Sequence, residues 1–382
     1  MAGVDHNLPA ATFVCSVCGA EAPSDPLRWR CACGGAFDLR FTPRFARERI
    51  VARAPSLWRY REALPIHDDG AVVTLGEGLT PLIALDLGRT VWLKQDQLFS
   101  SGSFKDRGAS LLISHARALG VHAVVEDSSG NAGAAIAAYC ARSSATGHPI
   151  ACTIYVPAST SPAKLAQIAA YGAHVERVAG SRDETARAVR AAAAHCYYAS
   201  HVWNPCFIHG CKTFAYELWE QMGWRAPDTL VLPVGNGTLL LGAALGFREL
   251  LEAGEIARVP RLIAVQAAAC APLATAFSAG AAAPLPVTRT PTLAEGIAIA
   301  EPARGAQVLA AVRASGGQVI AVDEPAIADA HARLARAGLY TEPTAAATIA
   351  GLLQELPGLA PTDCVASVLT GHGLKNVQPA AH

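Results

Sequence analysis

TLVLPVGNGTLLLG, residues 229–242, joins a strand-like apolar run to a glycine turn and to the apolar pattern of a helix. The same order recurs where HAVVED (122–127) precedes SSGNAG (128–133) and where VWLKQD (91–96) precedes SSGSFKD (100–106). Further strand-like runs follow at 150–156, 174–178, 261–266, 318–323 and 364–369. Because strands and helices alternate, we expect an α/β fold of parallel-type sheets covered by helices, with ligands at the carboxyl ends of the strands.

The composition suits large cores and excludes several classes of protein. The chain has 382 residues, of which 52% are hydrophobic and 16% charged, and its formal net charge is zero. No basic run predicts a nucleic-acid partner, and no apolar stretch is long enough to span a bilayer, so we expect no membrane partner. Residues 1–10 lack the pattern of a signal peptide. The odd count of 11 cysteines does not suit a disulfide framework, and we expect a cytoplasmic protein.

Lysine is scarce, which limits where amine chemistry can take place. Most basic residues are arginines, whose guanidinium stays protonated and cannot act as an amine nucleophile. Lys105 lies among small residues at the start of a predicted helix, where the helix dipole opposes a cation and lowers the pKa of the amine. We expect Lys94 and Lys164 to be solvated. The lysines are Lys94, Lys105, Lys164, Lys212 and Lys375.

The small-residue loops together suit one cofactor. The loop at 234–242 would point backbone N–H groups at an anion, although it matches neither a P-loop nor a G-x-G-x-x-G pattern. The asparagine in SSGNAG could serve a ligand or simply cap a helix. A lysine, an anion-binding turn and an asparagine loop together indicate pyridoxal phosphate, whose aldehyde takes the lysine as a Schiff base while its phosphate sits on the glycine turn.

The chain resembles the threonine synthase-like family of pyridoxal-phosphate-dependent enzymes, in the tryptophan synthase β-type class (fold type II). The resemblance runs from about residue 74 to 376 and implies two α/β domains that close over the cofactor, and a homodimer. It rests on eight motifs in the family's order, which are EGLTPL (77–82), SGSFKDRG (101–108), SSGNAG (128–133), AQIAAYGAHV (166–175), NPCFIHGCKT (204–213), APDTLVLPVGNG (226–237), EPTAAATIAGL (342–352) and TGHGLK (370–375).

The resemblance implies a role for individual residues. Lys105 would form the Schiff base and, once displaced by the substrate amine, act as a base. Asn131 would contact the ring hydroxyl of the cofactor, and Thr370 would face the ring nitrogen as a neutral partner, which favours elimination or replacement. The backbone N–H groups near the start of the helix at 131 would hold the substrate carboxylate. The remaining implied contacts are Gly235, Asn236, Gly237 and Thr238 to the cofactor phosphate, and Ser128, Ser129 and Gly130 to the substrate.

The chain departs from threonine synthases where those enzymes bind the phosphate of their substrate. Ala132 replaces a threonine that the family typically has. In the family's NSxNPxR stretch, His201, Val202 and Phe207 stand at the Asn, Ser and Arg positions, with Asn204 retained. The loss of these groups should weaken the binding of a phosphate dianion by several kcal/mol, at about 1.5–3 kcal/mol per charged hydrogen bond.

Several functions therefore remain open. We favour a lyase that eliminates or replaces a group at the β or γ carbon of a small amino-acid substrate. One alternative is an authentic threonine synthase, converting O-phosphohomoserine to threonine plus phosphate, with a site rebuilt around His201, Lys212 or Arg107. Another is a serine/threonine ammonia-lyase, because AEGIAI (294–299) resembles the dehydratases, with Glu295 facing either substrate or solvent. The last is a non-catalytic protein that binds pyridoxal phosphate, against which the intact cofactor residues argue.

Cysteine pairs mark a separate N-terminal head. Cys15 and Cys18 form C-x2-C, Cys31 and Cys33 form C-x-C, and a glycine follows each pair. Four such thiolates suit a structural tetrahedral zinc, and the alternative is a metal-free turn with buried thiols. The expected regions are a zinc-ribbon-like head at 1–45, a large cofactor-binding domain at 46–119 and 216–382, and a small α/β domain at 120–215.

Overall fold

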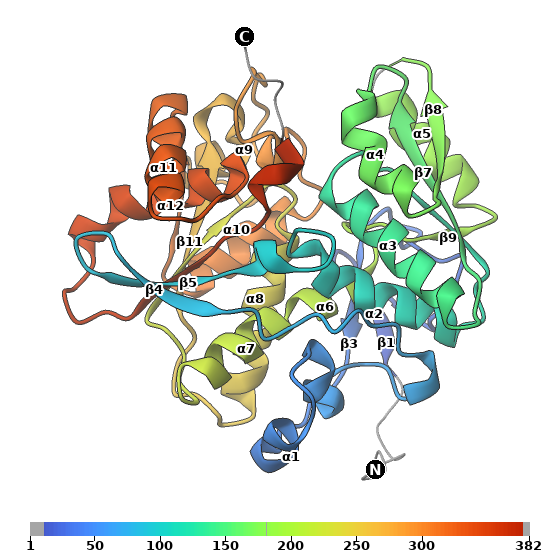
Figure 1. Ribbon diagram of the computed structural model, residues 1–382, viewed down its shortest axis with the longest axis horizontal. Coiled ribbons are helices and arrows are strands. Elements are labelled where there is room, and N and C mark those ends of the chain that lie inside the picture. The colour runs from blue at the N-terminus through green and yellow to red at the C-terminus, as the bar shows by residue number, and fades with distance from the viewer. Residues whose placement is uncertain (1–10, 181, 377–382) are drawn as a thin grey trace. The chain divides into compact units, whose positions relative to one another are not determined.

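The computed structural model describes residues 11–180 and 182–376 (Figure 1). Residues 1–10, to which the expected absence of a signal peptide refers, lie outside the described residues, as do 181 and 377–382. The chain divides into two compact units. The first comprises Met1–Leu79 and Lys105–Thr213, and the second comprises Thr80–Phe104 and Phe214–His382.

The second unit contains a mixed sheet whose strand order is β12-β11-β10-β13-β5-β4. Its strands are β4 (Leu82–Asp86), β5 (Thr90–Lys94), β10 (Thr229–Pro233), β11 (Arg261–Ala267), β12 (Gln318–Val322) and β13 (Val365–Val368). Neighbouring strands pair in parallel, except that β4 is antiparallel to β5. Every residue of β10 is buried, as expected for a strand covered on both faces.

Helices pack on this sheet in two groups. Helix α12 packs beside α11 and contacts β10 to β13, whereas α8 and α10 contact each other and β11 (Figure 1). Side chains of Leu93, Val231, Ile263 and Ile349 meet in the core between strands and α12. The helices are α7 (Thr213–Gln221), α8 (Thr238–Glu252), α9 (Pro272–Ser278), α10 (Gly305–Ala314), α11 (Glu324–Arg336) and α12 (Pro343–Glu355).

The first unit contains a parallel sheet with the strand order β8-β7-β6-β9. Its strands are β6 (Ala123–Glu126), β7 (Ala151–Pro157), β8 (His174–Val178) and β9 (Tyr197–Tyr198). Helices α3 and α5 pack on β7, and α4 packs on β8. The helices of the unit are α1 (Arg47–Ala52), α2 (Lys105–Ala118), α3 (Asn131–Ala145), α4 (Pro162–Ala170), α5 (Arg182–Ala192) and α6 (Pro205–Cys211).

A small antiparallel ribbon precedes these elements and belongs to the first unit. Its strands β1 (Thr12–Cys15), β2 (Glu21–Ala22) and β3 (Phe37–Arg40) pair in the order β2-β1-β3. Two histidines connect it to the helices: His209 on α6 bonds the Leu39 carbonyl at 3.0 Å, and His115 on α2 bonds Ser24 Oγ at 2.9 Å. The ribbon is therefore part of a packed body.

The predicted α/β class, with parallel-type sheets covered by helices and a cysteine-bearing ribbon, is confirmed. The predicted domain bounds stay a prediction. The compact units differ from them, since they group residues 46–79 and α2 with the sheet of β6 to β9, whereas the sequence suggested that 46–119 joins the large domain. The physical reason is that α2 packs on α3 and α6.

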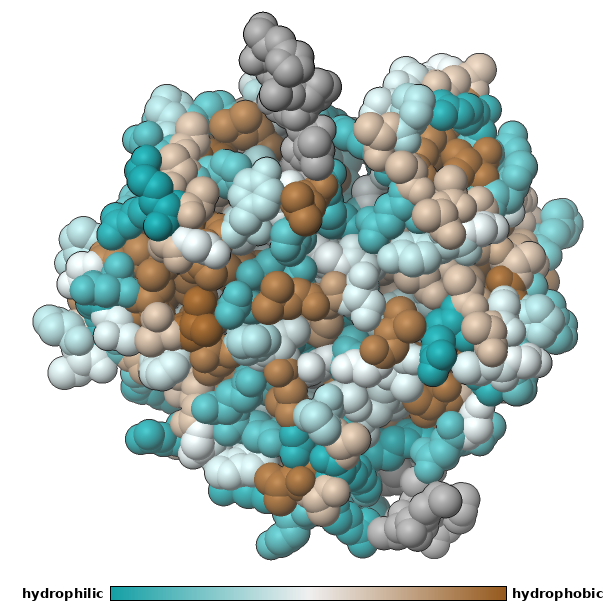
Figure 2. Space-filling view, in the orientation of Figure 1, coloured by the Kyte–Doolittle hydropathy of each residue, from teal (hydrophilic) through white to brown (hydrophobic). Residues whose placement is uncertain are grey.

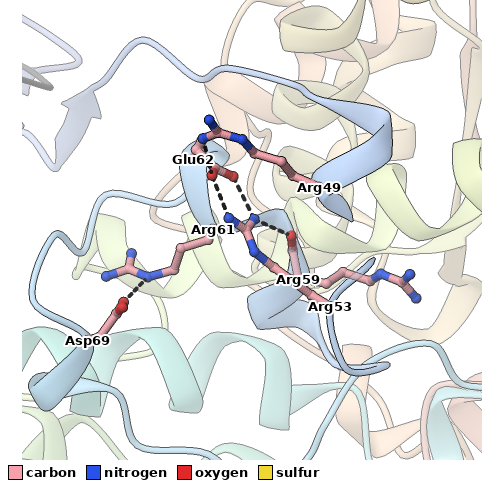
Figure 3. Close-up of polar contacts among 6 residues, drawn as sticks. All are labelled: Arg49, Arg53, Arg59, Arg61, Glu62 and Asp69. Carbon is pink, nitrogen blue, oxygen red and sulfur yellow. Dashed lines mark hydrogen bonds and ion pairs between the residues drawn. The ribbon is translucent and has the colours of Figure 1, made fainter. Parts of the chain in front are cut away.

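Arginines in the segment that follows the ribbon form ion pairs with carboxylates of the first unit (Figure 3). Arg53 donates to both carboxylate oxygens of Glu62, at 2.6 and 2.5 Å, and also to the Arg59 carbonyl at 2.9 Å. Arg61 Nε donates to Asp69 at 2.5 Å. The hydrogen bond from Arg53 lowers the pKa of the Glu62 carboxyl. These guanidiniums hold the 3₁₀ segment η1 (Leu57–Ala63) in place.

Hydrophilic and hydrophobic side chains are interspersed over the described surface visible in Figure 2. None of the described helices has the length and apolar character needed to cross a bilayer.

The expectation that Lys94 is solvated is wrong, whereas Lys164 is exposed as expected. Lys94 is fully buried in the second unit, where its Nζ lies 2.7 Å from a Glu217 carboxylate oxygen. The same ammonium donates to the Thr80 carbonyl at 2.6 Å and to Gln221 Oε1 at 2.7 Å. A strand pattern with one lysine cannot reveal this partner, because the partner lies on a helix more than a hundred residues away.

Lys94→Met should lower the free energy of unfolding by about 3–5 kcal/mol, because it leaves the Glu217 carboxylate buried without its cation. Adding Glu217→Leu should recover much of this loss, since a buried ion pair can often be replaced by apolar side chains. Urea unfolding of both variants tests this, with Lys164→Met as the exposed control. If Lys94→Met were as stable as the control, the pair would not be a structural contact.

Candidate active site

A glycine turn in the second unit connects β10 to α8. Gly237 precedes the helix with a φ of 84°, in the left-handed region that favours glycine. A Cβ on Gly237 would lie 2.3 Å from Val308 Cγ2, and one on Gly235 would lie 3.0 Å from Ile297 Cα. The turn therefore requires both glycines, and the first turn of the 15-residue helix α8 presents backbone N–H groups at the carboxyl end of β10. Thr238 is the first residue of that helix.

A second loop of this unit contains Thr370, which follows β13. Within the described residues, Thr370 Oγ1 and Ser103 Oγ are buried and have no hydrogen-bond partner. The loops that hold them are joined, because the Phe104 N–H donates to the Thr370 carbonyl and the His372 N–H to the Gly102 carbonyl, both at 2.9 Å. Buried hydroxyls are rarely left unpaired, so these two indicate a place for a polar ligand atom.

Lys105 follows Phe104 directly and is the first residue of α2, in the first unit. Its Nζ lies 5.5 Å from the centroid of the Phe207 ring on α6. A Cβ on Gly108 would lie 2.4 Å from the same ring. The glycine of SFKDRG is therefore needed so that Phe207 can pack beside the lysine.

The SSGN loop links β6 to α3 in the first unit. Ser128 Oγ accepts a hydrogen bond from the Gly130 N–H at 3.3 Å, and Gly130 takes the position just before the helix, which begins at Asn131. A Cβ on Gly133 would lie 1.9 Å from the Ser128 carbonyl oxygen. Ser129, between them, is half-buried. The loop folds tightly onto the first turn of α3, whose N–H groups can serve a carboxylate.

Sequence reasoning missed one acidic residue of this edge, Glu126. It is the last residue of β6, and its Oε1 lies 2.6 Å from His201 Nδ1. Burial raises the pKa of Glu126 to about 8 and lowers the pKa of His201 well below its ordinary value. The sequence gives no sign that Glu126 is part of a site, because its partner His201 is distant in the chain and an acidic residue at the end of a strand is common.

In threonine synthases certain positions bind the phosphate of the substrate. The side chains at these positions here are apolar or already form other hydrogen bonds. Val202 and Phe207 are buried. Asn204 caps α6, accepting from the Cys206 N–H at 3.0 Å and donating to Tyr197 at 2.8 Å. These side chains therefore serve packing and helix capping.

The cations suggested as replacements are engaged as well. Arg107 is fully buried and donates to Thr213 Oγ1 at 3.1 Å. Lys212 is fully buried, with its Nζ 5.2 Å from the centroid of the Phe41 ring. In the second unit Glu295 is exposed at the start of the 3₁₀ turn η5 (Glu295–Ile297), which matches the solvent-facing alternative.

The four cysteines of the ribbon come together. The Sγ atoms of Cys15, Cys18, Cys31 and Cys33 all lie within 4.8 Å of one another. Cys15 and Cys33 Sγ are 3.5 Å apart, and Cys18 and Cys31 Sγ are 3.6 Å apart. A hydrogen bond from the Cys18 backbone lowers the pKa of the Cys15 thiol to about 6. These separations are close to those between the sulfur ligands of a tetrahedral zinc, whose Zn–S bonds are about 2.3 Å.

Comparison with known proteins identifies the chain's relatives. The family model described as pyridoxal-phosphate dependent enzyme matches residues 73–371. A threonine synthase of Methanocaldococcus jannaschii is 34% identical over 96% of this chain and 93% of its own, and one of Mycobacterium leprae is 37% identical over 84% and 88%. Among solved structures, a T.th. threonine deaminase aligns with a TM-score of 0.65 at 27% identity, over 79% of this chain and 94% of its own. Maize serine racemase, 24% identical with a TM-score of 0.68 over 86% and 95%, shares the fold.

Thr370→Val should leave the free energy of unfolding of the cofactor-free protein unchanged or raise it by about 1 kcal/mol, because the buried hydroxyl has no partner to lose. Ser367→Ala is the matched control. Ser367 Oγ donates to the Val231 carbonyl at 2.9 Å, so its loss should cost about 1 kcal/mol. Urea unfolding of both variants makes the comparison. An equal loss in both would mean that the Thr370 hydroxyl is paired within the protein itself.

Proposed function

The chain belongs to the threonine synthase-like family of pyridoxal-phosphate-dependent lyases, and from that premise we propose that it eliminates or replaces an uncharged group at the β or γ carbon of a small amino acid. The observation that supports an uncharged leaving group is the packing around His201, Val202 and Phe207. A phosphate dianion requires several charged hydrogen bonds, whereas Val202 and Phe207 are apolar and His201 is uncharged, with its Nδ1 committed to Glu126.

The donor groups of the second unit fit the phosphate and the ring of the cofactor. We propose that the turn formed by Gly235, Asn236, Gly237 and Thr238 binds the phosphate, because it combines space for a close approach with the N-terminus of a long helix. We propose that the unpartnered Thr370 hydroxyl faces the ring nitrogen. Because a hydroxyl is neutral, it stabilises charge on the ring less than a carboxylate does.

The residues of the first unit would form the bond to the cofactor, transfer the proton and bind the substrate. Lys105 would bond the aldehyde carbon and, after its release, take the proton from the substrate Cα. Asn131 would donate to the ring hydroxyl. The loop at Ser128, Ser129 and Gly130, with the N–H groups that begin α3, would bind the substrate carboxylate. When bound, pyridoxal phosphate supplies the electron-withdrawing ring that makes loss of the Cα proton possible.

Authentic threonine synthase activity is the second candidate, and the identity to the Methanocaldococcus jannaschii threonine synthase favours it. For this activity the phosphate of O-phosphohomoserine must be bound by other groups, because Arg107 and Lys212 are buried and engaged elsewhere in the structure. The similarity to the T.th. threonine deaminase favours a hydroxyl leaving group, as in a serine/threonine ammonia-lyase.

A substrate panel separates these activities. The purified protein, loaded with pyridoxal phosphate, is mixed with serine, threonine, their uncharged O-substituted derivatives and O-phosphohomoserine, and the products are identified by mass spectrometry. We expect turnover of a substrate with an uncharged leaving group, and little or no phosphate release from O-phosphohomoserine. Release of phosphate together with threonine would instead establish the second candidate.

Lys105→Ala is the control for the panel. It should abolish both turnover and the borohydride-trapped adduct, which peptide mapping should locate at Lys105 in the unaltered protein. An adduct at another lysine would show that the cofactor binds at that lysine and not at Lys105. Absence of any product despite bound cofactor would support a non-catalytic protein.

We also propose that the ribbon binds a structural zinc through Cys15, Cys18, Cys31 and Cys33. Two of the thiols are buried and two exposed, and the four ligands leave no position for water, which suits a structural site. Because the ribbon packs on α2 and α6, the metal would also stabilise the surroundings of Lys105. A cytoplasmic location stays a proposal that rests on the odd number of scattered cysteines, and a homodimer stays a proposal that rests on the family resemblance.

Metal analysis of the purified protein should find about one zinc per chain. Strong chelation, or Cys18→Ser with Cys33→Ser, should remove the metal and lower the melting temperature, because a structural zinc contributes directly to folding free energy. Cys364→Ser, outside the ribbon, should keep the zinc. A metal-free protein that is indifferent to chelator would favour the alternative of a turn with buried thiols.

A further inference from the structure

A buried acid–histidine pair lies outside the motifs that define the family resemblance. Glu126 ends β6, and His201 follows β9, the neighbouring parallel strand, in which Tyr198 pairs with Val125. Since the carboxyl ends of parallel strands share one edge of a sheet, the two side chains reach the same point of that edge. Their Nδ1–Oε1 distance is 2.6 Å.

Both side chains are shielded from water. Glu126 is 0% exposed and His201 is 8% exposed. The second carboxylate oxygen of Glu126, Oε2, is buried without a hydrogen-bond partner among the described residues. An ionised carboxylate with one oxygen unsatisfied is costly in such surroundings, so a proton held between the two groups is favoured.

Lys105 and His201 both lie next to the Phe207 ring. The Phe207 ring is 5.5 Å from Lys105 Nζ and, edge to face, 6.0 Å between centroids from the His201 ring. The positive charge of Lys105 acts on both Glu126 and His201. The lysine and the pair thus border the same aromatic side chain.

Other charged and titratable groups face the pair. Asp127, next in the loop, accepts from the Tyr198 hydroxyl at 2.9 Å, and burial raises its pKa. Arg182, at the start of α5, is exposed and acts on Glu126, Asp127 and His201 at longer range. Among these groups, Lys105 is the cation whose state the proposed function uses.

Burial sets the protonation state of the pair. It raises the pKa of Glu126 to about 8, against the opposing effects of a hydrogen bond from the Asp127 backbone and of the charge of Lys105, and it lowers the pKa of His201. Near neutral pH the pair therefore has no net charge and one proton in its hydrogen bond. Above about pH 8 the pair loses a proton and becomes a buried anion.

We propose that Glu126 and His201 are positioning residues that hold a shared proton beside Lys105 and so set the protonation state of the Lys105 nitrogen. This proposal rests on the proposed function of Lys105. While the pair is neutral, the lysine nitrogen can lose its proton and serve as a nucleophile or base. Once the pair is an anion, it favours the protonated nitrogen, so the nitrogen retains its proton to higher pH.

The first test uses the unaltered protein. Histidine ring NMR signals are followed against pH in the protein as purified, and His201 is assigned as the signal lost in His201→Phe. We expect the His201 signals to move with a midpoint near pH 8, the pKa of the carboxyl that shares its proton, and not at an ordinary histidine value of about 6.5. A His201 that titrates at the ordinary value, or with no transition near pH 8, overturns the proposal.

The second test measures the Lys105 nitrogen by the pH dependence of the visible absorbance of the pyridoxal-phosphate-loaded protein. Glu126→Gln should lower the midpoint by about one pH unit or more, because it removes the anion that favours the protonated nitrogen. His201→Phe should shift it the same way, since Glu126 then stays protonated to higher pH. The double variant should shift it no further than Glu126→Gln alone, because the two residues act as one unit.

His115→Gln is the matched control. His115 is also a buried histidine of the first unit, but it bonds Tyr197 and Ser24 instead of a carboxylate. Its loss should leave the midpoint unchanged. Additive shifts, or an equal shift in His115→Gln, would show that the pair has only a structural role. A borohydride adduct at a lysine other than Lys105 would overturn the proposed function, whereas a His201 transition near pH 8 would still identify the proton-holding pair.

Discussion

Two glycines allow α2 and α6 to touch through their backbones, and the position of Lys105 depends on that contact. A Cβ on Gly210 would lie 2.1 Å from the Arg107 carbonyl oxygen, and a Cβ on Gly108 would lie 2.4 Å from the Phe207 ring. A side chain at either position would push the helices apart and move the lysine away from the aromatic ring. Because α6 also packs on strand β3 of the ribbon, the same contact connects the cysteine cluster to the start of α2.

Features that depend on neighbouring residues were predictable from the sequence. The alternation of strand-like and helical runs predicted the parallel sheets, since each run has its own period and its own turn residues. The starts of α2 and α3 were predicted within a residue, because small polar residues and glycine fill the loop that precedes each helix. The C-x2-C and C-x-C pairs likewise predicted that four thiols would meet, because each pair needs only a local turn followed by glycine.

Features that depend on distant partners were not predictable. Lys94 lies in a strand pattern and was expected to be solvated, yet its charge is neutralised by a glutamate on a distant helix. Glu126 shows no local sign of its pairing with His201. The grouping of α2 with the small sheet in one compact unit follows from helix–helix packing and not from chain order. In each case the decisive contact joins residues that the sequence separates widely.

Packing connects the positions at which the chain departs from the threonine synthase pattern. Phe207 fills the space that Gly108 leaves on α2. His201 has its Nδ1 committed to Glu126, and the carboxylate oxygens of that pair would repel a phosphate once ionised. The departures from the threonine synthase pattern at 201 and 207 therefore form one packed arrangement with α2 and β6, since the two rings also lie edge to face. Under the proposed function, this arrangement suits a neutral leaving group.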